Sequence, residues 1–60
     1  MKLNRSEKYI FLKLTEELNE LSKELLQAVN KTDKNNWGKI CDEISDVENW
    51  ITKIRECKQC

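Results

Sequence analysis

The chain of 60 residues contains no proline, no histidine and a single glycine. It therefore has few of the residues that most often interrupt a helix. The absence of histidine excludes nucleophilic catalysis by Ser-His or Cys-His pairs. The short length leaves room for one folding unit at most and excludes a large α/β enzyme.

Charge of one sign and long apolar runs are also missing. Eleven Lys and Arg residues balance eleven Asp and Glu residues, so the formal net charge is zero. This balance gives no indication of a basic surface that would bind a nucleic-acid polymer. No run of 18 apolar residues exists, residues 1–7 lack the apolar segment of a signal peptide, and an odd number of cysteines argues against a disulfide framework. We expect a cytoplasmic protein that binds neither a nucleic-acid polymer nor a membrane.

Apolar residues recur at steps of three and four in two segments, which is typical of amphipathic helices in bundles. The first set is Phe11, Leu14, Leu18, Leu21, Leu25 and Ala28, and the second is Trp37, Ile40, Ile44, Val47, Ile51 and Ile54. Residues 31–36 contain no apolar side chain and are rich in types that form turns and caps. We predict a helix over about 5–30, a turn over about 31–36 and a helix over about 37–56, with Asp33, Asn35 or Asn36 as the second N-cap.

Two helices joined by a short polar turn form an antiparallel hairpin, so the predicted fold class is all-α. One such hairpin has too little core to be stable alone, whereas two hairpins packed seam to seam form a four-helix bundle. Leu12, Leu26 and Val29 lie beside the first seam and would be covered by further association. We therefore expect a homo-oligomeric four-helix bundle, either a homodimer or a homotetramer.

Five carboxylates flank the two apolar seams. At 100° per residue, Glu17, Glu20 and Glu24 lie within about 60° of one another on the first helix. Glu43 and Asp46 flank the second seam in the same rotational sense, so a hairpin places both flanks on one side. One interpretation is a solvated charged face; the other is a Mg²⁺ site, because that ion prefers hard carboxylate oxygens. Repulsion between like charges at these spacings favours the second interpretation.

The motifs that carry these carboxylates resemble a known family. Segments 16–21 (EELNEL) and 42–47 (DEISDV) are similar to the E-x-x-E and E-x-x-D motifs of the MazG-like all-α nucleotide pyrophosphohydrolases. The resemblance covers about residues 11–54, and the 22 residues between Glu20 and Glu43 fall within the spacing that the family tolerates. It implies that a nucleoside triphosphate is hydrolysed to monophosphate and pyrophosphate. The implied catalytic and Mg²⁺-binding residues are Glu17, Glu20, Glu43 and Asp46, with Glu16 or Glu24 as general base.

The chain departs from that family at both ends. Typical members carry another helix before the first motif and more chain after the second, whereas here sixteen residues precede Glu17 and fourteen follow Asp46. Such a minimal chain resembles short phage-encoded versions of the family. Two alternatives to hydrolysis stay open. One is a sponge that binds and sequesters a nucleotide or cyclic-nucleotide signal without chemistry, and the other is a structural helical interaction module.

A few other side chains are candidates for contacts with a nucleotide. Trp50 follows Asp46 by one helical turn, where it either stacks on a nucleobase or fills a dimer interface. The full predicted nucleotide-binding set is Lys13, Glu24, Trp50 and Lys53. Cys57 and Cys60 form a C-x-x-C pair that either binds zinc between two copies or remains as two free thiols.

Overall fold

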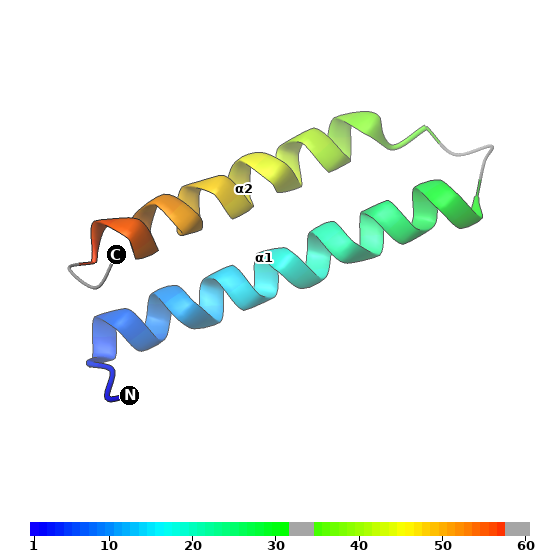
Figure 1. Cartoon of the computed structure of the whole chain (residues 1–60). Coiled ribbons are helices and arrows are strands. Elements are labelled where there is room, and N and C mark those ends of the chain that lie inside the picture. The colour runs from blue at the N-terminus through cyan, green and yellow to red at the C-terminus, as the bar shows by residue number, and fades with distance from the viewer. Residues whose placement is uncertain (32–34, 58–60) are drawn as a thin grey trace.

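The computed structural model describes residues 1–31 and 35–57. Over these residues the protein is entirely helical outside its short ends and connection, with α1 at Arg5–Asn30 and α2 at Trp37–Glu56. The two helices lie side by side and antiparallel (Figure 1). The all-α hairpin predicted from the apolar spacing is therefore confirmed. Asp33, one of the candidate caps, falls outside the described residues.

A capping box starts α1. The side chain of Asn4 accepts a hydrogen bond from the Glu7 amide at 2.8 Å, and the Glu7 carboxylate accepts one from the Asn4 amide at 2.9 Å. Two otherwise unpaired amides are satisfied in this way. At the other end, the Lys31 amide donates to the Gln27 carbonyl at 2.8 Å and closes the last turn.

The start of α2 is built differently. Asn36 occupies the N-cap, as one of the predicted alternatives, but its side chain makes no capping hydrogen bond. Asn35 Oδ1 instead accepts a long hydrogen bond of 3.4 Å from the Trp37 amide. Trp37 begins the second apolar set identified in the sequence, but within the hairpin it is not packed and is 73% exposed.

The two helices meet through only one edge of the apolar seams predicted from the sequence. Leu18 and Leu25 are each 46% exposed and Ile44 is 40% exposed, whereas Glu24 and Glu43 are buried between the helices. On each helix the apolar residues cover an arc of the surface, and the residues that touch the other helix form a narrower contact strip. The contact strip lies at the edge of the apolar arc, about 60° around the helix axis from the centre of that arc. The predicted seams are therefore real apolar stripes, but only part of each stripe is covered within one hairpin.

Little apolar surface is enclosed in this shape. The hairpin is a rod with extents of 45 × 16 × 15 Å. Of the apolar side chains that the structure describes, Ile40 and Val47 alone are buried. Neither helix carries an apolar stretch long enough to cross a membrane, over the residues described.

Candidate functional site

Three carboxylates from the two helices converge near the middle of the hairpin. Glu17 comes from α1, and Glu43 and Asp46 come from successive turns of α2. One carboxylate oxygen from each lies within 4.8 Å of the others. Glu43 is buried, Glu17 is half-buried and Asp46 is exposed, so the group extends from the helix interface to the surface. We call these three residues the acidic triad.

Glu43 is the innermost member of the acidic triad and only 8% exposed. Its Oε2 atom is buried and has no hydrogen-bond partner among the described residues. Its Oε1 atom lies 3.9 Å from Lys39 Nζ, which is too long for a direct hydrogen bond. The negative charge of Glu43 is thus held in the helix interface with only partial compensation, which costs stability in the absence of a further partner.

Glu17 is also affected by the negative charges around it. Desolvation raises the pKa of Glu17 above its ordinary value, and the nearby Asp46 and Glu43 carboxylates raise it further. Lys13 acts in the opposite direction. A cation bound among the three carboxylates would relieve this repulsion.

The donor set of the acidic triad fits Mg²⁺. The ion takes hard oxygen ligands, and carboxylates from two facing helices are a common way to hold metal ions in bundles. The unpartnered oxygen of Glu43 supplies a ligand atom that nothing else in the described chain uses. Glu17, Glu43 and Asp46 are therefore the residues that would bind such an ion.

Glu20, the fourth predicted ligand, is not brought into this group. It is exposed on α1 and lies outside the acidic triad. Glu20 is one turn from Glu17 but about 60° further from the contact strip around the helix, so its side chain starts on the outer edge of α1. The motif spacing predicts which turns of the two helices lie opposite each other, and the rotation of α1 decides which of its carboxylates faces α2.

Glu24 holds the start of α2 against α1. Its Oε1 atom and its main-chain carbonyl both accept hydrogen bonds from Asn36 Nδ2. It lies two turns beyond Glu17, about 10 Å along the axis of α1. This role could not be predicted from the sequence, because the partner of Glu24 is the N-cap residue of the other helix.

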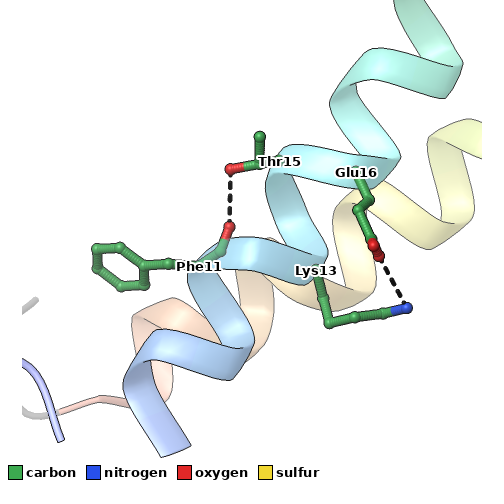
Figure 2. A network of polar contacts seen from close by, with 4 residues as sticks. All are labelled: Phe11, Lys13, Thr15 and Glu16. Atoms are coloured by element: carbon green, nitrogen blue, oxygen red, sulfur yellow. Dashed lines mark hydrogen bonds and ion pairs between the residues drawn. The ribbon is translucent and has the colours of Figure 1, made fainter. Parts of the chain in front are cut away.

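Glu16 and Lys13 form an ion pair on the surface of α1. Lys13 Nζ lies 3.0 Å from Glu16 Oε2, while Thr15 Oγ1 donates to the Phe11 carbonyl one turn away (Figure 2). Lys13 is one of the predicted nucleotide-binding residues, and its direct partner in the hairpin is Glu16. Of the two candidate general bases, Glu16 is thus engaged by Lys13 and Glu24 by Asn36.

An aromatic and cationic group lies one turn from the acidic triad. Trp50 is half-buried and meets Tyr9 edge-on, with ring centroids 5.9 Å apart and planes at 73°. Lys53 Nζ lies 5.7 Å from the Trp50 ring centroid, a distance typical of a cation–π contact. Sequence reasoning missed Tyr9, which could be found only from the antiparallel register that places it opposite Trp50.

The cysteines add no support for a zinc site. Cys57 is half-buried, and its thiol donates to the Lys53 carbonyl at 3.4 Å, while Cys41 is exposed on α2. Cys60 lies outside the described residues, so the C-x-x-C prediction stays a prediction.

Comparison with protein-family models found no match, and comparisons with curated proteins and with solved structures found no significant similarity.

Proposed function

We propose that this protein binds a nucleotide through Mg²⁺ as a homo-oligomeric four-helix bundle, and that it hydrolyses a nucleoside triphosphate to monophosphate and pyrophosphate. The observation that carries the proposal is the acidic triad, in which the buried Oε2 of Glu43 lacks a partner. The similarity of the two acidic motifs to MazG-like enzymes gives the class of ligand. Glu20 is retained from that resemblance as a residue that could approach the ion from the outer edge.

The charges of the site explain why an ion is needed. Three carboxylates alone would repel a triphosphate. Glu17, Glu43 and Asp46 would hold a Mg²⁺ ion, which would reverse the local field and make a water bound to it more acidic. The half-buried position of Glu17 limits the water that would compete for the ion.

The neighbouring side chains suit the rest of a nucleotide. Lys13 and Lys53 supply positive charge on the side of the hairpin where Asp46 is exposed, and both can exchange their present partners for phosphate oxygens. Trp50, one turn from Asp46, offers an aromatic surface for a base once Lys53 moves from its ring.

A second candidate function is sequestration of a nucleotide without chemistry. One specific observation favours it: Glu16 is paired with Lys13, and Glu24 is hydrogen-bonded to Asn36, so both predicted bases are engaged with partners outside the acidic triad. Hydrolysis requires a group that takes a proton from the attacking water. Sequestration requires only the ion and the contacts to the ligand.

One experiment separates these functions. The purified protein is mixed with Mg²⁺ and a panel of nucleotides, including cyclic dinucleotides, and the solution is chromatographed before and after the protein is denatured. Monophosphate plus pyrophosphate identifies the enzyme. A nucleotide that disappears on mixing and returns unchanged on denaturation identifies the sponge.

Matched variants locate the site. Glu43→Gln should abolish either result, whereas Asp42→Asn, which removes one charge from an exposed neighbouring position on α2, should preserve it. If the wild-type protein neither binds nor converts any nucleotide with Mg²⁺ present, the proposal fails, and a purely structural helical module becomes the better account.

A further inference from the structure

An apolar stripe along one side of the hairpin is only partly covered: Leu18, Leu25 and Ile44 are exposed, and Leu14 and Ile51 are half-buried. Leu14, Leu18 and Leu25 lie about 60–100° around α1 from Glu17, and Ile44 and Ile51 lie about 80–100° around α2 from Glu43. The rotational sense is the same on both helices. Because the helices are antiparallel and face each other (Figure 1), the two stripes lie on the same side of the hairpin. We call these five residues the leucine face.

The position of the leucine face is characteristic of a bundle with four helices. In a two-helix pair, the apolar arc of each helix is centred on the line to its neighbour. In a square bundle each helix has two neighbours at right angles, so its apolar arc is centred between them, about 45° from either. Here the apolar arcs are turned about 60° from the contact strip. The rotation of α1 and α2 therefore leaves room for one further helix beside each of them, as in a four-helix bundle.

The exposed area supports the same conclusion. The chain exposes 5013 Å². A compact monomer of 7.2 kDa would expose about 4,100 Å². The excess of about 900 Å² is close to the roughly 800 Å² that each partner buries in a stable interface. The chain therefore exposes enough surface for one such interface.

We propose that the leucine face binds the leucine face of a second copy, and that each copy keeps a complete acidic triad on the opposite side. This inference deepens the homo-oligomer of the proposed function, on which it rests. Ile44 and Asp46 lie about 160° apart around α2. Asp46 is exposed, so the interface forms behind the triad and leaves its outer edge open to a ligand.

The test is the association of the full chain, measured by sedimentation equilibrium from low to high micromolar concentration. The wild-type protein should show a particle of about twice 7.2 kDa or an even multiple of it. Leu18→Lys should weaken dimerisation by roughly 100-fold or more, because a symmetric interface would bury two unpaired ammonium groups. Leu12→Lys is the matched control, since Leu12 lies on the same helix about 120° away and is 66% exposed.

A second measurement needs no variant, in case Leu18→Lys fails to fold. Mixed isotope-labelled and unlabelled wild-type protein should give intermolecular methyl contacts at Leu18 and Ile44. Contacts at Leu12 and Leu26 without any at Leu18 would overturn the proposal. So would an assembly that Leu12→Lys dissociates and Leu18→Lys does not, or a folded monomer at every concentration.

The outcome is independent of nucleotide binding. A folded monomer that binds a nucleotide with Mg²⁺ overturns the leucine-face proposal and leaves the ligand proposal standing. A dimer through the leucine face that binds no nucleotide does the reverse.

Discussion

The side-chain amide of Asn36 donates hydrogen bonds to two oxygens of Glu24, the main-chain carbonyl at 2.9 Å and Oε1 at 3.0 Å. Both residues are buried. The pair joins the N-cap position of α2 to the last two turns of α1. Asn36 thus fixes one helix against the other instead of capping its own helix.

We expect Asn36→Ala to lower the free energy of unfolding by about 1–3 kcal/mol, because the buried Glu24 carboxylate would lose its hydrogen-bond donor. Chemical denaturation followed by circular dichroism measures the change at a fixed protein concentration. Asn35→Ala is the control, since Asn35 is exposed and its hydrogen bond to the Trp37 amide is long. Equal losses in the two variants would contradict a special role for the Asn36–Glu24 pair.

The raised pKa of Glu17 predicts a stability that falls as pH rises. Glu17 keeps its proton to higher pH in the folded chain than in the unfolded chain, so the folded state binds more protons in that interval. The destabilising contribution begins near the ordinary pKa of glutamate, about 4.3, and is complete above the raised pKa of Glu17. Glu17→Gln removes it.

The test compares wild-type and Glu17→Gln proteins by thermal unfolding at several pH values, with a chelator present to remove divalent ions. The advantage of the variant should grow as pH rises from about 4 and then level off. A difference in stability that stays constant with pH would show that Glu17 titrates alike in both states.

Glu43→Gln should change stability in opposite directions with and without Mg²⁺. Without the ion, the substitution relieves a buried carboxylate and stabilises the protein by about 1 kcal/mol. With the ion at about 100 times its dissociation constant, the wild-type protein gains roughly 2.7 kcal/mol and the variant gains little. Asp42→Asn, measured in parallel, should respond to Mg²⁺ as the wild-type protein does.

Gly38→Ala should stabilise the hairpin. Gly38 lies in the first turn of α2, and a Cβ atom added there would meet nothing within 4 Å. Alanine restricts the unfolded chain more than glycine does, which favours folding by about 0.4–1 kcal/mol at a compatible position. A lower melting temperature for this variant would show that α2 starts later than Trp37.

The sequence was sufficient to predict the two helices and their antiparallel direction, because apolar periodicity and a polar turn are local signals. It was not sufficient to predict how each helix is rotated about its axis, since the apolar arc of each helix is wider than the strip that touches the other helix. That rotation decides whether Glu17 or Glu20 faces Glu43. The Asn4–Glu7 capping box was readable as Asn-x-x-Glu, whereas the Asn36–Glu24 pair depends on how the connection folds.

The contact of Trp50 with Tyr9 and Lys53 gives the site its own optical reporter. The wavelength and intensity of indole emission change with the surroundings of the ring. Trp50 is half-buried one turn from Asp46, whereas Trp37 is exposed to solvent. Replacing Trp37 with phenylalanine would leave Trp50 as the single tryptophan of the chain. Ion or ligand occupancy could then be followed in real time without attaching a dye.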